Sequence, residues 1–211
     1  MATATDTLYL SELRRVWAGQ TDSAHDLPHV QRVWQSCQTI AAAEGANLKV
    51  LHPAALLHDI INPPKSSPKR AEASLLSANY AIEFLKTTRY PHALIPQVHH
   101  AIHAHSFSAK IRPESLEAQV LQDADRLDAL GAIGIARCFA VSGQLGRTLF
   151  HPTDPMATDR PLDESTYALD HFQTKLFPIA QTLCTPKARE IAAERIRFMH
   201  SFCQTLTNET C

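Results

Sequence analysis

The residues best suited to chemistry in this 211-residue chain are histidines and aspartates at three separate places in the sequence. They are His29, the adjacent pair His58 and Asp59, and Asp125. Imidazole nitrogens and carboxylate oxygens together suit divalent ions such as Mn²⁺, Fe²⁺, Mg²⁺, Zn²⁺ and Co²⁺, and such a ligand set leaves coordination positions for water and substrate. If the fold brings these residues together, we expect a metal centre.

The identity of the fourth ligand is left open by the pattern, because three aspartates lie close together in the segment 123–128. On a helix, Asp125 and Asp128 point within about 60° of each other, whereas Asp123 points away. The spacing alone therefore allows either Asp125 or Asp128 to complete the set.

The elements that must position these residues are helices, since apolar side chains recur with a helical period almost throughout the chain. Asp26 is a good N-cap, which places His29 in the first turn of a helix that runs to about residue 44. A helix predicted to start at Pro53 carries His58 and Asp59 near its end, where neighbouring side chains about 100° apart can reach one ion.

Further helices are predicted along the rest of the chain, and no segment shows the alternation of a β-strand. Their expected ranges are 7–19, 67–86, 92–104, a helix opened at 112–114 that carries Asp125, 130–142, 163–183 and a last helix from 185 to about 206. Residues 143–162 are rich in glycine and proline and predict a long loop, which we interpret as a lid over a site. The whole chain, residues 1–211, is expected to form a single domain.

Composition excludes several classes of protein. Apolar residues make up 45% and charged residues 19% of the chain, as in globular proteins, and the net charge of −1 gives no support to binding of a nucleic-acid polymer. No apolar run approaches the roughly 18 residues that a membrane helix needs, and no secretory signal precedes the first helix. Five cysteines without a C-x-x-C pair favour reduced thiols and a cytoplasmic location.

Longer motifs surround the candidate ligands: His25-Asp-Leu-Pro-His29-Val-Gln-Arg32, Leu56-Leu-His-Asp-Ile60, Lys65-Ser-Ser-Pro-Lys-Arg70, His105-Ser-Phe-Ser and Gln122-Asp-Ala-Asp-Arg-Leu-Asp-Ala-Leu-Gly131. With them, the chain resembles the HD-domain metal-dependent phosphohydrolases, in particular the small stand-alone group of bacteria and fungi. The resemblance covers roughly residues 22–206. It implies an all-α bundle of about eight helices with a metal site between helices.

The resemblance also assigns roles around the metal. It implies His29, His58, Asp59 and Asp125 as ligands of a divalent ion, Mn²⁺ being favoured and Mg²⁺, Co²⁺, Ni²⁺, Fe²⁺ or Zn²⁺ being possible. Asp128 would then orient an imidazole ligand. The implied reaction is hydrolysis of a nucleotide, such as a nucleoside triphosphate giving monophosphate and pyrophosphate, through attack of metal-activated water on phosphorus.

Other residues are expected at the substrate. The resemblance places His100 and His105, with Asp59, among the catalytic residues. Lys65, Arg70, His103 and Lys175 are further candidates for binding a phosphorylated small molecule, since a triphosphate needs several positive groups beside the metal. The alternative for the histidines at 99–105 is a solvated polar face or a helix C-terminus that favours imidazolium. The oligomeric state stays open.

Two other functions remain alternatives. Some HD-fold proteins hold two irons and use O₂ to cleave a bond, and the histidines at 99–105 would supply extra ligands. Asn62 argues against this, because those oxygenases often carry another histidine there. A non-catalytic nucleotide-binding domain is the second alternative, and the presence of every signature ligand argues against it.

Overall fold

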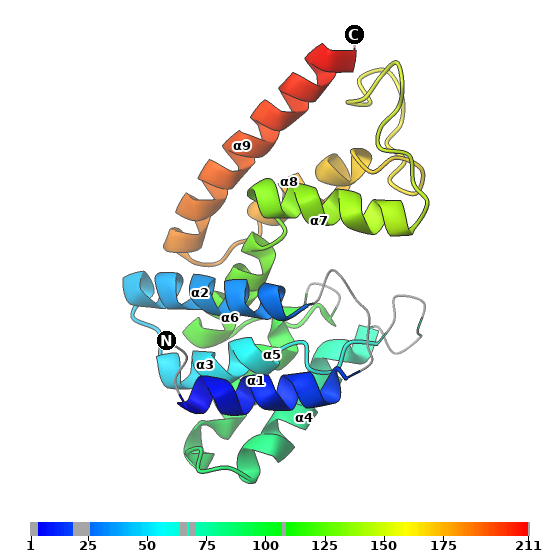
Figure 1. Ribbon diagram of the computed structural model, residues 1–211. Helices are drawn as coiled ribbons and strands as arrows, with labels where there is room; N and C mark the ends of the chain where they lie inside the picture. Colours follow the sequence, from blue (N-terminus) through cyan, green and yellow to red (C-terminus); the bar gives the residue numbers. More distant parts are fainter. Residues whose placement is uncertain (1–3, 19–25, 64–66, 68–70, 107–108, 211) are drawn as a thin grey trace. The chain divides into compact units, whose positions relative to one another are not determined.

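The computed structural model describes residues 4–18, 26–63, 67, 71–106 and 109–210 (Figure 1). Within these residues the chain is helical, without a β-strand, and its single β-bridge joins Thr148 to Tyr167. The elements are α1 (Ala4–Val16), α2 (Leu27–Glu44), α3 (Leu48–Leu57), α4 (Ala73–Lys86), η2 (His92–Leu94), α5 (Ile95–His105), α6 (Leu116–Leu127), α7 (Gly131–Gln144), η4 (Phe172–Leu176), α8 (Phe177–Ala180) and α9 (Pro186–Thr210). The predicted all-α class is confirmed. None of the described helices has the length and apolar character needed to cross a membrane.

The chain divides into two compact units, Met1–Asp125 and Arg126–Cys211, with the division inside α6. His29, His58, Asp59 and Asp125 all belong to the first unit. Asp128 and Lys175 belong to the second. A single domain over 1–211 stays a prediction.

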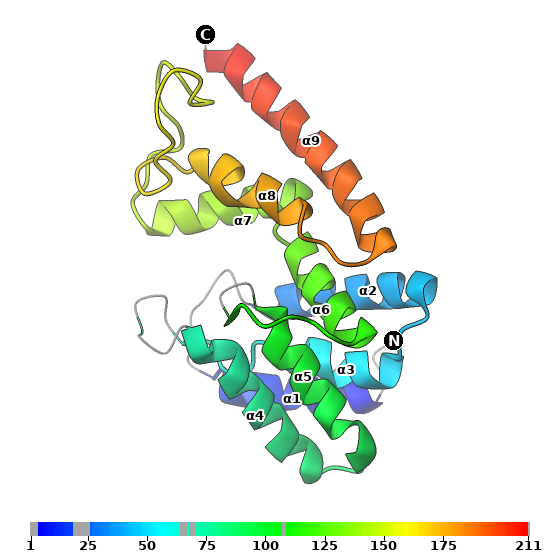
Figure 2. The ribbon, with the colours of Figure 1, turned by 180° about the vertical axis from the view of Figure 1, so that it is seen from behind.

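Helix α3 lies at the centre of the first unit, in contact with α1, α2, α4 and α5 (Figures 1 and 2). Its sequence is apolar around most of its circumference, which is the pattern of a helix packed on all sides. Its fully or almost fully buried residues are Val50, Leu51, Pro53, Ala54, Ala55, Leu56 and Leu57. Burial of each large apolar side chain contributes roughly 1.5–3 kcal/mol. The residue that follows this helix, His58, is consequently in the interior.

The start of α3 differs from the prediction that the helix begins at Pro53. The helix begins at Leu48, because Asn47 caps it by accepting a hydrogen bond from the backbone N–H of Lys49 at 3.0 Å. Pro53 then lies inside the helix, where its missing N–H would leave the carbonyl of Lys49 without a partner. The hydroxyl of Tyr90 donates to that carbonyl at 3.0 Å, which explains why the proline is tolerated.

In the second unit, the long helix α9 packs against α7 and α8. Aromatic rings fill its interior: Phe172, which is fully buried, lies 6.0 Å from Phe139 and 6.2 Å from both Phe177 and Phe202 between ring centroids. The apolar side chain of Phe172 thus anchors η4, a π-helical turn, and the short helix α8 that follows it.

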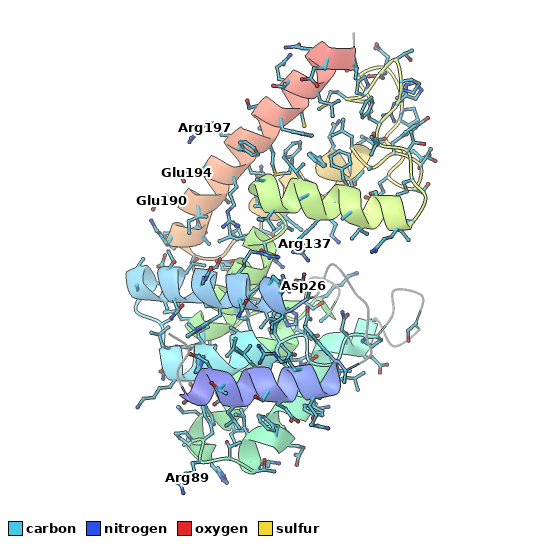
Figure 3. The ribbon with its side chains drawn as sticks, viewed as in Figure 1. Asp26, Arg89, Arg137, Glu190, Glu194 and Arg197 are labelled. Carbon is cyan, nitrogen blue, oxygen red and sulfur yellow. The ribbon has the colours of Figure 1, made fainter. Side chains whose placement is uncertain are left out.

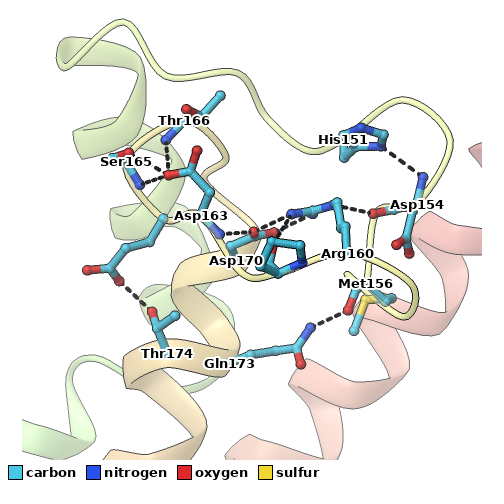
Figure 4. A network of polar contacts seen from close by, with 12 residues as sticks. His151, Asp154, Met156, Arg160, Asp163, Ser165, Thr166, Asp170, Gln173 and Thr174 are labelled. Carbon is cyan, nitrogen blue, oxygen red and sulfur yellow. Dashed lines mark hydrogen bonds and ion pairs between the residues drawn. The ribbon is translucent and has the colours of Figure 1, made fainter.

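The stretch from 145 to 171 between α7 and η4 contains no helix (Figure 4). The expected restart of a helix at 163 is wrong, because the carboxylate of Asp163 accepts hydrogen bonds from the backbone N–H groups of Ser165 and Thr166 and folds the chain into a turn. The buried carboxylate of Asp170 accepts two hydrogen bonds from Arg160, at 2.6 and 2.7 Å. This ion pair ties the stretch to the start of η4.

Candidate metal centre

His58 occupies the C-cap of α3 and is completely buried. Its Nδ1–H donates to the carbonyl of Ala55 at 2.8 Å, which is one of the last carbonyls of the helix and lacks an intrahelical partner. In the neutral ring this leaves the lone pair on Nε2. Burial lowers the pKa of His58 to about 4, outweighing the opposing charges of Asp59 and Asp125. The ring is therefore neutral at pH 7, in the form that binds metal ions.

His29 faces His58 from the first turn of α2. Its side chain is also completely buried, and the two Nε2 atoms lie 3.3 Å apart. The carboxylate of Asp125, on α6, approaches the Nε2 of His29 to 3.5 Å. Three helices thus converge on this point, as the sequence predicts.

Asp59 completes the cluster from the turn that follows α3. One of its oxygens lies 3.5 Å from the Nε2 of His58 and 3.8 Å from the Nε2 of His29. Its side chain is 15% exposed and that of Asp125 is 28% exposed, whereas both imidazoles are fully buried. The cluster is therefore covered on its imidazole side and accessible on its carboxylate side.

His105, the last residue of α5, extends the cluster beyond Asp59. Its Nδ1–H donates to the carbonyl of Ile102 at 2.5 Å, and its Nε2 lies 3.5 Å from the second oxygen of Asp59. Burial acts to lower the pKa of His105, but the hydrogen bond and charge of Asp59, with smaller effects from Asp125 and Ile102, raise it overall. His105 therefore holds a proton more readily than His58 does.

The donors present fit a divalent metal ion. His29, His58 and Asp125 form one group of ligand atoms within 4.8 Å of one another, and His58, Asp59 and His105 form a second that shares His58. Nitrogen and oxygen ligands bound at about 2.1 Å to one ion lie about 3.0–3.4 Å apart, close to the separations in this cluster. The Nε2 of His58, which carries the lone pair of that ring, faces the Nε2 of His29 at 3.3 Å, so both rings can bind one cation between them.

Two other histidines predicted at the site, His100 and His103, lie on α5 but do not face the same way as His105. On α5, His100 and His103 are rotated by about 140° and 160° from His105, so they face different directions. The Nε2 of His100 accepts a hydrogen bond from the backbone N–H of Glu114, and the ring of His103 lies beside that of His99, 5.9 Å between centroids. None of the hydrogen bonds or ion pairs given for the described residues joins either ring to the cluster.

Of the remaining predicted residues, two lie outside the described ranges and two belong to the second unit. Lys65 and Arg70 lie outside the described residues. Lys175 is exposed on η4, and Asp128 accepts a hydrogen bond at 2.6 Å from Arg137; both lie in the second unit. Their roles toward a substrate or an imidazole stay predictions. Asp125, by contrast, faces His29 directly.

The capping bond of Asp26, a residue labelled in Figure 3, acts directly on the site, because the Asp26 carboxylate accepts it from the backbone N–H of His29 itself, at 2.9 Å. The Asp-x-x-His spacing is a visible signal for this link. Replacing Asp26 by alanine is expected to destabilise the protein by about 1 kcal/mol and to weaken Mn²⁺ binding, since the first turn of α2 loosens. Urea denaturation and a Mn²⁺ titration measure both effects. Asp26→Ser keeps a capping oxygen and should restore them; equal Mn²⁺ affinity in all three proteins would contradict the link.

Comparisons with known proteins agree with this geometry. Residues 27–130 match the HD domain family model. The uncharacterized protein YpgQ of Bacillus subtilis is 34% identical over 191 residues, covering 89% of this chain and 85% of YpgQ. The crystal structure of YpgQ in complex with ADP superposes with a TM-score of 0.73 at 32% identity, over 95% of this chain and 97% of that one. An HD-superfamily hydrolase from Bacillus thuringiensis gives a TM-score of 0.73 at 30% identity, with 98% of both chains covered. With the histidine and aspartate cluster in place, the chain belongs to the HD-domain superfamily of metal-dependent phosphohydrolases.

Proposed function

We propose that this protein hydrolyses the phosphoric ester or anhydride of a nucleotide with the help of a divalent metal ion held by His29, His58, Asp59 and Asp125. The observation that carries the proposal is the convergence of two buried imidazole Nε2 atoms, 3.3 Å apart, with two partly exposed carboxylates. The specific reaction we favour is cleavage of a nucleoside triphosphate to monophosphate and pyrophosphate. The crystal structure of the related YpgQ with ADP supports a nucleotide as the substrate class.

The residues of the chain prepare the site for this chemistry. When bound, a divalent ion supplies positive charge that lowers the pKa of a coordinated water and offsets the charge of a phosphoryl group. The backbone bonds from Nδ1 of His58 and of His105 fix which ring nitrogen faces the cluster. His105, whose pKa is raised, would present a proton from Nε2 to a phosphate oxygen on the far side of Asp59. Asp59 would orient that proton.

Contacts to the substrate remain predictions. Lys65, Arg70, His103 and Lys175 are the proposed partners of the phosphates, and His100 is a further proposed proton donor. Mn²⁺ is the ion we favour among the several divalent ions that a set of two imidazoles and two carboxylates suits.

An activity screen of chelator-stripped protein tests the proposal. Mn²⁺, Mg²⁺, Co²⁺, Ni²⁺, Fe²⁺ and Zn²⁺ are added back in turn with nucleoside mono-, di- and triphosphates, and phosphate is separated from pyrophosphate. We expect metal-dependent turnover that releases pyrophosphate from a triphosphate. Release of inorganic phosphate instead would contradict the specific reaction. A lack of turnover by folded protein that binds metal would overturn nucleotide hydrolysis.

A second candidate is an oxygenase with two irons. The observation in its favour is the second ligand group, His58, Asp59 and His105, which overlaps the first at His58. It would require about two irons per chain and a coloured protein after aerobic purification. Iron analysis and an absorption spectrum therefore separate it from the hydrolase.

A further inference from the structure

We propose that Trp17 and Ser77 are positioning residues for Asp59: they hold the turn that carries Asp59 and thereby set the affinity of the centre for a divalent ion. The inference rests on the metal site proposed above. It concerns one residue directly after α1 and one residue on α4, and both act through the backbone of the turn. Neither residue belongs to a recognisable sequence motif.

The turn in question is the segment 58–61, which follows the last residue of α3. The N–H of Ile60 donates to the carbonyl of Leu57 at 3.2 Å, which links this turn back to the end of the helix. The indole Nε1–H of Trp17 donates to the carbonyl of Ile60 at 3.1 Å. The hydroxyl of Ser77 accepts from the N–H of Ile61 and donates to its carbonyl, both at 3.1 Å. Two side chains, one directly after α1 and one on α4, thus fix the backbone just after Asp59.

A fixed backbone matters here because the carboxylate of Asp59 must satisfy several partners at once. It contacts the Nε2 atoms of His58, His29 and His105 at 3.5, 3.8 and 3.5 Å. Metal–ligand distances tolerate deviations of only about 0.2 Å. Ser77 and Ile60 are fully buried, so water does not readily replace the missing hydroxyl. Loss of the Ser77 hydroxyl would leave both polar groups of Ile61 without that partner and allow the turn to shift.

Trp17 is itself held in place, because α1 is attached to the rest of the first unit at two earlier points. Asp6 contacts the Nε2 of His52 on α3 at 2.5 Å, and Glu12 accepts a hydrogen bond from the hydroxyl of Tyr80 on α4. The match to the HD family model begins at residue 27, after α1. Helix α1 and Trp17 therefore lie outside the matched residues, and yet Trp17 bonds to the turn that carries the His-Asp pair.

The test measures Mn²⁺ affinity and stability separately in Ser77→Ala and Trp17→Phe. Free Mn²⁺ is followed by electron paramagnetic resonance during titration of chelator-stripped protein, and stability by urea denaturation without metal. We expect the Kd for Mn²⁺ to rise about 10-fold or more in Ser77→Ala, as for other residues that support metal ligands. In Trp17→Phe, which keeps the apolar ring and loses one hydrogen bond, we expect a rise of roughly 3- to 10-fold.

Matched controls lie on the same helix and in the same residue class. Ser74 is also buried on α4, and its hydroxyl has no hydrogen-bond partner within the described part of the chain. Trp34 packs on His52, 4.7 Å between ring centroids, away from the turn. Ser74→Ala and Trp34→Phe should therefore bind Mn²⁺ as the wild type does.

The outcomes separate this inference from the proposed function. If wild-type protein binds no more Mn²⁺ than Asp59→Ala does, the metal site fails and the positioning role fails with it. If binding depends on Asp59 while Ser77→Ala and Trp17→Phe bind like their controls, the positioning role alone is overturned, even if the urea midpoint falls. Should Ser77→Ala not fold, Trp17→Phe decides the question, because Trp17 is only half-buried and its ring is retained.

Discussion

Replacing Asp59 by alanine is expected to abolish metal binding and, with it, turnover. Within the described cluster, Asp59 is the side chain that contacts three histidines, His29, His58 and His105. Changes in residues that merely support a metal ligand typically cost 10- to 100-fold in affinity. Removal of a proposed ligand should cost more, so we expect the Kd for Mn²⁺ to rise by more than about 100-fold.

Equilibrium dialysis with Mn²⁺ and the nucleotide assay measure the two effects of Asp59→Ala. Asp159→Ala, which removes an exposed aspartate of the second unit, is the control and should behave as wild type. Asp59→Asn adds a readout that is independent of metal: because Asp59 raises the pKa of His105, the pKa of that ring should fall in the variant, as followed by NMR in chelator. Unchanged specific activity in Asp59→Ala would remove Asp59 from the ligand set.

The sequence allowed prediction of the ligands because their signals are local. Asp26 precedes α2 by one residue, so the cap and the place of His29 in the first turn follow from neighbouring residues. His58 and Asp59 are adjacent, and a helix end presents both. The convergence of these segments with Asp125 was predicted by residue type and family resemblance, and the structure supplies the distances.

What could not be predicted depends on partners distant in the sequence. Pro53 is typical of a first helical turn, and only the hydroxyl of Tyr90 on the carbonyl of Lys49 makes an interior position tolerable. Ser77 is one of several small residues on an apolar helix face, and its partner is a backbone group 16 residues earlier. Neither contact leaves a pattern in the local sequence.

The histidines at 99–105 also show that the sequence alone does not determine which residues reach the site. Their clustering in sequence suggested a shared role, but a helix separates neighbours by about 100°, so one cluster in sequence becomes several faces. His105 reaches Asp59, His100 bonds to the backbone of Glu114, and His99 bonds to Asn79. Which face meets the site depends on how α5 packs, and periodicity alone does not determine that.

The metal-free protein is expected to lose stability as the pH falls from 7 to 4.5, chiefly through His58. Burial holds the pKa of His58 at about 4 in the folded state, against 6.5 for an unperturbed histidine. The unfolded chain therefore binds a proton that the folded chain does not, over the window between these two values, and stability rises with pH there. At 1.36 kcal/mol per pH unit, the loss down to pH 4.5 amounts to roughly 2 kcal/mol.

Three further histidines, His99, His103 and His171, have pKa values lowered chiefly by burial, and they reduce stability in the same direction as the pH falls below 6.5. The pKa of His105 is raised, so the stability it contributes is fully present below the unfolded value of 6.5 and is lost as the pH rises through the folded value. The carboxyl groups whose pKa values are lowered, such as those of Glu12 and Asp163, lose their contribution mostly below pH 4.5. His58 is the fully buried member of the four histidines whose pKa values are lowered, and its own contribution is the difference in slope between wild type and a His58 variant.

Urea denaturation in chelator at pH 7, 5.5 and 4.5 measures this dependence in wild type, His58→Gln and His92→Gln. The glutamine variant of His58 changes the free energy of unfolding at every pH, so the slope against pH is the quantity compared. We expect a flatter slope in His58→Gln and a wild-type slope in His92→Gln, which replaces an exposed histidine of η2. Equal slopes in all three proteins would mean that His58 is not held neutral by burial, and the neutral Nε2 donor proposed for the metal would lose its basis.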